Sequence, residues 1–195
     1  MKDLSLHIFD IVENSVKAGA KTVTLEFAWN ETVFSFCIAD DGAGFPKGIK
    51  EDPSDPFRTT RTERKVGLGL ALLKDSAEQC GGKMKIGQGD KGGVKIEADF
   101  DLSHIDSKPI GDIEDLIITC MTAWPQMDWI VKIKDKREAL LNTAEIRAEL
   151  GEINMNSPEI RNFILRQLSS DLNPMHAWLR GIKVRLSKKH FSKFL

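Results

Sequence analysis

The stretch Asp10-Ile-Val-Glu-Asn14-Ser-Val-Lys17 decides how the N-terminal half of this chain is interpreted. It lies in a segment, residues 3–18, whose apolar residues recur at helical spacing, which predicts an amphipathic helix. Steps of four and seven residues return to within roughly 40° of the start on an α-helix. Asp10, Asn14 and Lys17 therefore form one polar column beside the apolar stripe.

A carboxylate, an amide and an ammonium in one column suit a magnesium–phosphate site. The amide oxygen of Asn14 can ligate a hard cation, Asp10 can orient or deprotonate water, and Lys17 can meet a phosphate. An ordinary solvated helix face has the same composition, so this interpretation depends on the residues that follow.

A glycine-rich bend follows this helix and a pair of strands. Alternating apolar residues predict strands near residues 23–27 and 34–38, and the second runs into Asp40-Asp41-Gly42-Ala43-Gly44. The Asp40 carboxylate can accept a hydrogen bond from an exocyclic amine such as N6 of adenine, and the two glycines let the backbone approach a flat ligand. An ordinary glycine-rich turn is the alternative interpretation.

A second glycine-rich element, Val66-Gly-Leu-Gly-Leu70, leads into a helix predicted over residues 68–80. The start of a helix offers free N–H groups and a positive dipole end to phosphates. The long polar loop before it, residues 47–66, is of a length that is usually functional in compact domains. The element is not a P-loop, because no Gly-Lys-Ser/Thr follows the glycines.

The order of predicted elements indicates an α/β fold. Two further strands, at about residues 83–87 and 93–100, make hairpin-linked pairs that alternate with helices. This order predicts a two-layer α/β sandwich with a mixed sheet and helices on one face. It is followed, after a boundary marked by Pro109, by a small α+β C-terminal unit.

Three units are expected along the chain: residues 1–104, a helix–hairpin–helix–helix unit at 105–172, and a basic helical tail at 173–195. Within the C-terminal half, a helix is predicted to open at Pro158, the tolerated first position for proline, and to end near residue 169. A last helix is expected to open at Pro174.

Charge and composition exclude several classes of protein. Residues 1–172 contain 22 basic and 29 acidic side chains, whereas residues 173–195 contain six basic and no acidic ones. A nucleic-acid-binding protein would usually show a larger basic surface, and no apolar run approaches the ~20 residues that span a bilayer. Three widely spaced cysteines predict reduced thiols. With no signal segment at its start, the sequence predicts a cytoplasmic protein.

In this order and spacing, the motifs resemble the Bergerat-fold (GHKL) ATP-binding domain shared by gyrase subunits, the ninety-kilodalton heat-shock chaperones, sensor histidine kinases and MutL. Residues 10–20 look like its N box, and residues 40–44 look like its Asp-x-Gly-x-Gly box. Residues 56–60 with 67–70 look like the lid and final glycine box of sensor kinases. The resemblance covers residues 3–101 and implies a Bergerat-type sandwich that binds ATP and magnesium.

The resemblance also implies a role for each motif residue. Asn14 would hold magnesium, Asp40 would bind the adenine amine, and Gly42 and Gly44 would shape the adenine pocket. Contacts to phosphates are implied for the lid residues Thr60 and Arg61 and for the final box Gly67, Leu68 and Gly69, and Lys17 of the polar column stays a further candidate for such a contact.

Asp10 falls at the family position that is glutamate in the hydrolases and in the serine-kinase branch, and commonly asparagine in histidine kinases. An acid there favours base-assisted hydrolysis or phosphorylation of a hydroxyl, and Glu13, about 60° round the helix, is the second candidate base. No hairpin with a phosphoacceptor histidine precedes the N box, and His7 on the N-box helix is expected to be structural. A stand-alone domain is therefore expected.

Three functions follow from the resemblance. We expect a slow ATPase in which ATP closes a lid at residues 53–66 and so controls a protein partner. A protein kinase acting in trans on serine or histidine is the alternative, and a non-hydrolysing module that uses ATP structurally is a third. Residues 105–170 look similar to a region of short proteins encoded near hydrogenase and NADH-oxidoreductase subunits, which makes such subunits candidate partners.

Overall fold

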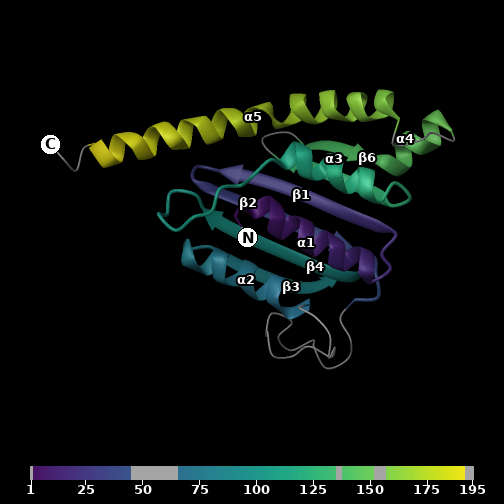
Figure 1. Cartoon of the computed structure of the whole chain (residues 1–195), viewed down its shortest axis with the longest axis horizontal. Helices are drawn as coiled ribbons and strands as arrows, with labels where there is room; N and C mark the ends of the chain where they lie inside the picture. The colour runs from purple at the N-terminus through teal and green to yellow at the C-terminus, as the bar shows by residue number, and fades with distance from the viewer. Residues whose placement is uncertain (1, 45–65, 135–137, 152–156, 192–195) are drawn as a thin grey trace.

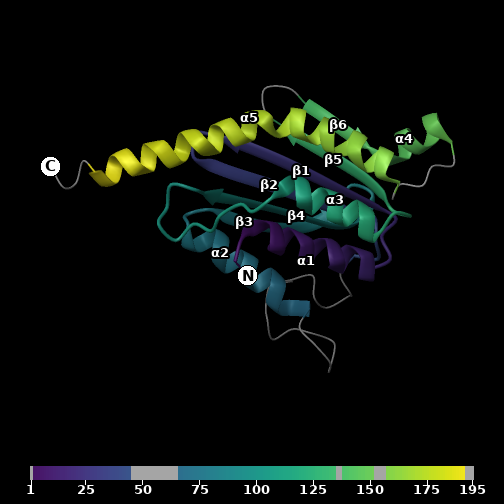
Figure 2. The same cartoon turned by 45° about the horizontal axis from the view of Figure 1, so that its top comes forward.

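The computed structural model describes residues 2–44, 66–134, 138–151 and 157–191, whose strands form one six-stranded sheet (Figure 1). Figure 2 shows α1, α2, α3 and α5 on the same side of that sheet. In chain order the elements are α1 Leu4–Lys17, β1 Thr22–Asn30, β2 Val33–Asp40, α2 Val66–Gln79, β3 Lys83–Gly89, β4 Gly92–Asp101, α3 Ile113–Ala123, β5 Asp128–Lys134, β6 Glu138–Asn142, α4 Thr143–Leu150 and α5 Pro158–Phe191.

The sheet is mixed, with strand order β3-β4-β2-β1-β5-β6. Neighbouring strands are antiparallel except β1 and β5, which pair in parallel, with Val23 opposite Trp129. The predicted α/β sandwich with a mixed sheet and helices on one face is confirmed. The hairpin β5–β6, expected within a separate C-terminal unit, extends this same sheet, and the unit boundaries at residues 104 and 172 stay predictions.

The core lies between the sheet and its helices. Alternate residues of β1 and β2, such as Leu25 and Phe36, are buried on the helix side, as period-two patterning requires. Ile8 and Val12 of α1 are fully buried against them. This packing fixes α1 over the middle of the sheet and therefore fixes the polar residues that α1 carries.

The first turn of α1 is held at its N-terminus by two segments. The Asp3 carboxylate accepts a hydrogen bond from the Leu6 N–H at 3.0 Å, which is an N-cap. The Leu4 N–H donates to the Pro109 carbonyl at 2.9 Å, and the Ser5 N–H donates to the Ile110 carbonyl at 2.8 Å. The connection that follows β4 thus satisfies N–H groups that a helix start leaves free.

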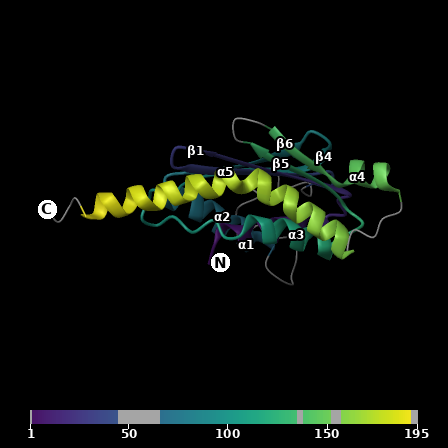
Figure 3. The ribbon, with the colours of Figure 1, turned by 90° about the horizontal axis from the view of Figure 1, so that it is seen from above.

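The last helix differs from its prediction. We expected one helix to end near residue 169 and another to open at Pro174, but α5 runs unbroken from Pro158 to Phe191 with Pro174 inside it. Figure 3 shows that α5 bends along its length, as an interior proline leads one to expect. Buried Leu168 and Leu172 before the proline and Met175 after it fasten both parts to the body.

The far part of α5 reaches the turn between β1 and β2. The Trp178 indole N–H donates to the Glu31 carbonyl at 2.7 Å, and the Trp178 ring lies 6.3 Å from that of Trp29. No helix in the described part of the chain combines the length and apolar character that crossing a membrane requires.

Candidate nucleotide site

A cavity of about 150 Å³ lies between α1, α2 and the strands β2 and β4. Most of its lining is apolar, and its polar side chains come from α1 and from the end of β2. The lining residues are Ile11, Asn14, Ser15, Ala18, Ile38, Asp40, Gly44, Leu70, Val94 and Ile96. A concave, mainly apolar space with a few convergent polar groups is typical of a small-molecule site.

Asp40 is the last residue of β2 and is buried, with only 7% of its surface exposed. Its carboxylate accepts hydrogen bonds from the Ser15 hydroxyl at 2.7 Å, the Gly42 N–H at 3.0 Å and the Val94 N–H at 3.2 Å. These three donors hold the carboxylate at the cavity wall. An ionised carboxylate has about four lone-pair sites, so it can still accept a hydrogen bond from a ligand amine.

Glycines let the backbone close around Asp40. Gly44 adopts φ +70°, a left-handed conformation, and lines the cavity. Gly93, at the start of β4, adopts φ +51°, and a β-carbon there would collide with the backbone carbonyl and carboxylate of Asp40. Gly93 was not singled out from the sequence, where it was only the first residue of the strand predicted over residues 93–100.

Ser15 is the other residue that sequence reasoning missed. It lies on the apolar side of α1 and is buried, with 3% exposed. A hydroxyl on an apolar helix face needs a partner when it is buried, and that requirement is the signal that could have identified it. Its partner is the Asp40 carboxylate.

The polar column on α1 divides between the cavity and the helix surface. Asn14 lines the cavity, and its side chain makes no hydrogen bond to another described residue. Lys17 and Glu13 pair with each other, with 3.2 Å between Nζ and Oε2, at an exposed position outside the cavity lining. The structure therefore brings Asn14 and Asp40 together, and it places Lys17 and Glu13 beside them at the surface.

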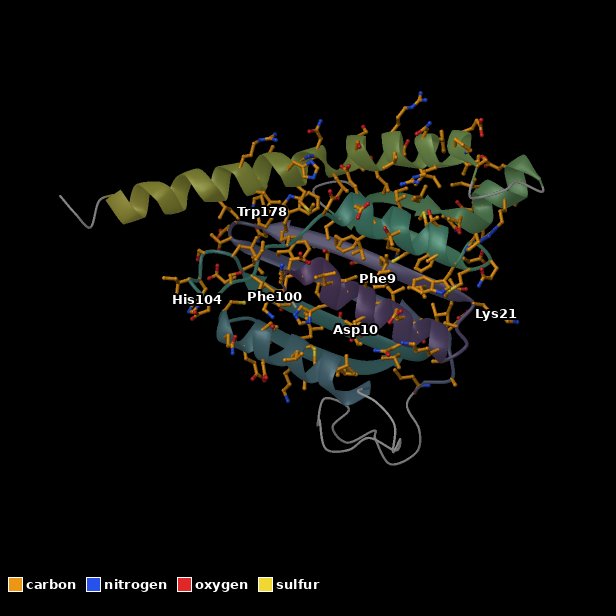
Figure 4. All side chains as sticks on the ribbon, viewed as in Figure 1. Phe9, Asp10, Lys21, Phe100, His104 and Trp178 are labelled. Carbon is orange, nitrogen blue, oxygen red and sulfur yellow. The ribbon has the colours of Figure 1, made fainter. Side chains whose placement is uncertain are left out.

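Asp10 lies between α1 and α2 (Figure 4), and it is not among the residues that line the cavity. Its carboxylate lies against Gly69, where a β-carbon would meet it directly. Burial, and after it the nearby Glu13 carboxylate, raise the pKa of Asp10, while Lys17 opposes this rise. Asp10 therefore holds its proton more tightly than an ordinary aspartate.

The final glycine box begins α2. Gly67, Leu68 and Gly69 lie in the first turn of this helix, which the structure describes from Val66 onward. The predicted lid residues Thr60 and Arg61 lie outside the described residues. The roles assigned to all of these residues stay predictions.

Comparison with known proteins assigns the region that contains these residues to a family. Residues 2–104 match the family described as histidine kinase-, DNA gyrase B- and HSP90-like ATPases. The chain belongs to this family. The matched range includes α1 to β4 and every candidate site residue.

Individual relatives of this ATPase-family chain are sensor kinases. The sensor protein kinase CarS of Pseudomonas aeruginosa is 28% identical over 104 residues, which are 52% of this chain and 23% of CarS. A putative NtrY-like sensor histidine kinase of Rickettsia conorii is 25% identical over 111 residues, 55% of this chain and 18% of that protein. The chain thus spans less than a quarter of the length of these relatives.

Two solved structures are similar to part of this chain. The ATP-binding domain of PrrB from Mycobacterium tuberculosis is 26% identical, covers 49% of this chain and 64% of its own, and has a TM-score of 0.39. The N-terminal domain of a DNA repair protein is 13% identical, covers 73% of this chain and 52% of its own, and has a TM-score of 0.44.

Proposed function

We propose that this chain binds magnesium ATP in the cavity beside Asp40, hydrolyses it slowly, and uses closure of the 53–66 lid to control a protein partner. The observation that carries the proposal is the buried Asp40 carboxylate, held by three protein donors at the wall of an apolar cavity that Asn14 also lines. An apolar space with one fixed acceptor suits a flat base that carries an exocyclic amine.

Asn14 is the residue that would hold magnesium. Among residues 2–44, 66–134, 138–151 and 157–191, no three histidine, cysteine or acidic side chains gather as a metal cage. Magnesium fits this donor set, because it usually takes one or two protein ligands together with waters and substrate phosphates. When bound, the ion would neutralise phosphate charge, and Asn14 would orient it through the amide oxygen.

The first turn of α2 would bind the phosphates. Its N–H groups at Gly67, Leu68 and Gly69 and its positive dipole end suit anions. Thr60 and Arg61, from the lid, are proposed to contact the terminal phosphate. Lys17 would have to leave its exposed ion pair with Glu13 to join them.

Asp10 is proposed to act as the general base. It adjoins Gly69, so it lies beside the proposed phosphate position, and its raised pKa moves it toward the range in which a base works well. Asp10→Asn should keep nucleotide binding and lose most turnover, measured as free phosphate released. Unchanged turnover would remove Asp10 from this role and leave Glu13 as the candidate.

A kinase acting in trans is the second candidate, because relatives that match about half of this chain are named sensor kinases. The discriminating experiment incubates the chain with radiolabelled ATP and proteins that co-purify with it. Label on a protein supports the kinase, whereas label only in free phosphate supports the ATPase. Hydrogenase and NADH-oxidoreductase subunits are the first proteins to test, in the cytoplasm, where ATP is available.

The binding proposal is tested by calorimetric titration of MgATP into the wild type, Asp40→Asn and Asp90→Asn. The Asp40 variant loses one charge-assisted acceptor, so its affinity should fall at least about tenfold. Asp90, exposed in the β3–β4 turn, is the matched control and should not change the affinity. A wild type that binds no MgATP, or an Asp40 variant with unchanged affinity, would contradict the proposal.

A further inference from the structure

Lys108 joins three segments that are distant in the sequence. It lies in the connection between β4 and α3, and its ammonium donates to the Ser76 hydroxyl of α2 at 2.7 Å. The same Nζ lies 3.0 Å from Nε2 of His7 on α1. One side chain therefore bridges α1 and α2.

His7 contributes to this bridge as a neutral acceptor. The ring is buried, with 1% exposed, and burial followed by the charge of Lys108 lowers the pKa of His7 to about 4. Because Nε2 faces the ammonium donor, the ring proton belongs on Nδ1, which has no hydrogen-bond partner among the described residues. A buried, unpaired N–H costs free energy. The contact between His7 Nε2 and Lys108 therefore forms although it leaves the Nδ1–H of His7 without a partner among the described residues.

The residues after Lys108 are fastened to α1 as well. The carbonyls of Pro109 and Ile110 accept the first N–H groups of α1. Gly111 adopts φ +86°, and a β-carbon there would lie 2.9 Å from that of Ser5. Two residues after Gly111, at Ile113, the chain enters α3. The start of α3 is therefore positioned by the same contacts that fasten the connection to α1.

The two bridged helices are the ones that carry the proposed nucleotide contacts. Asn14 lies on α1 and the first glycine turn on α2. At one level the helices touch through Asp10 and Gly69. Ser76 lies seven residues beyond Gly69, about 10.5 Å along the helix, so the Lys108 bridge holds the pair at a second level.

We propose that Lys108 is a positioning residue of the nucleotide site, which fixes the separation of α1 and α2 and couples nucleotide binding to α3. The proposal rests on the proposed function, because it requires that one nucleotide contacts both helices. A ligand that contacts both helices favours one separation, and the connection that depends on this separation leads into α3. Coupling of this kind is reciprocal between the two regions.

The test uses the full chain and four proteins: the wild type, Lys108→Met, Lys108→Arg and the control Lys83→Met, whose side chain is 69% exposed. MgATP affinity is measured by calorimetry, and amide hydrogen exchange of residues 108–123 is measured with and without MgATP. Lys108→Met should weaken affinity at least about fivefold, the lower end of typical coupling, and lose the nucleotide-dependent protection of α3. Lys108→Arg, which keeps the donors, should restore both, and Lys83→Met should match the wild type.

A folded Lys108→Met protein with wild-type affinity and wild-type exchange overturns the proposal. If Lys108→Met does not fold, Ser76→Ala and His7→Gln replace it. Ser76→Ala removes one acceptor and should weaken affinity, whereas His7→Gln supplies an amide oxygen and should preserve it; wild-type behaviour of Ser76→Ala overturns the proposal. A wild type that binds no MgATP refutes the proposed function itself, so the two failures are distinguishable.

Discussion

The Asp10 carboxylate on α1 packs directly against Gly69 on α2. A β-carbon built on Gly69 would lie 3.0 Å from Asp10 Cγ and closer still to Oδ2. The two helices therefore approach each other at a point where one supplies a carboxylate and the other only backbone. This contact joins the proposed base to the proposed phosphate-binding turn.

Gly69→Ala should disturb this contact, because either Asp10 or α2 must move. Overpacking of this kind costs typically about 1–3 kcal/mol of unfolding free energy, and we expect a parallel loss of MgATP affinity. Urea denaturation and calorimetry measure the two effects. Gly87→Ala is the control, because a β-carbon at that exposed position of β3 meets nothing within 4 Å. Equal stability of the two variants would contradict this account.

The raised pKa of Asp10 predicts a pH-dependent stability. In the folded chain this carboxyl binds its proton more tightly than in the unfolded chain, whose value is about 3.8. The unfolding free energy should therefore fall as pH rises from 3.8 through the raised value, and level off above it. Asp10→Asn has no titrating carboxyl at this position. Its stability relative to the wild type should therefore increase as the pH rises from 3.8 through the raised pKa of Asp10.

Urea denaturation over a series of pH values measures this difference. In a Glu13→Gln background, the pH range over which the two stabilities diverge should narrow, because Glu13 is one cause of the raised pKa of Asp10. A difference between wild type and Asp10→Asn that stays constant with pH would show that Asp10 titrates as an ordinary carboxyl.

Asn14→Ala should weaken binding of MgATP much more than binding of ATP in a chelator. Loss of an outer-shell partner already costs about 10–100-fold in metal affinity, so loss of a direct ligand should cost at least about tenfold. Calorimetry with and without magnesium separates the two effects. Asn30→Ala, at the exposed end of β1, is the control. Equal MgATP affinity of wild type and Asn14→Ala would remove Asn14 as the metal ligand.

Ser15→Ala should destabilise the chain, because the buried Asp40 carboxylate loses a donor at 2.7 Å. A hydrogen bond to a charged group contributes about 1.5–3 kcal/mol, and urea denaturation should show a loss in this range. Ser170→Ala, at an exposed position of α5, is the matched helical control. A loss no larger than that of the control would mean that Asp40 is held without Ser15.

The local parts of the fold could be predicted from the sequence. The α1 stripe, the alternation of β1 and β2 and the turn after Asp40 each depend on neighbouring residues, so their patterns are readable. The division of the polar column was not predictable, because the pairing of Lys17 with Glu13 and the contact of Asp10 with Gly69 depend on where α2 packs.

Long-range contacts explain the other differences. Nothing in the alternation of β5 says that it pairs in parallel with β1, about a hundred residues earlier. Pro174 is a local signal for a helix start, and the packing of Leu172 and Met175 on the body overrides it. The Lys108 bridge likewise joins residues that only the folded chain brings together.

The parallel pairing of β5 with β1 limits how this protein can be dissected. The part that matches the ATPase family ends at residue 104, before β5 begins. A truncation there would strip one edge of β1 of its partner along residues 22–28, and bare strand edges recruit other chains. We expect such a fragment to aggregate, so the nucleotide chemistry has to be studied with residues 105–195 attached.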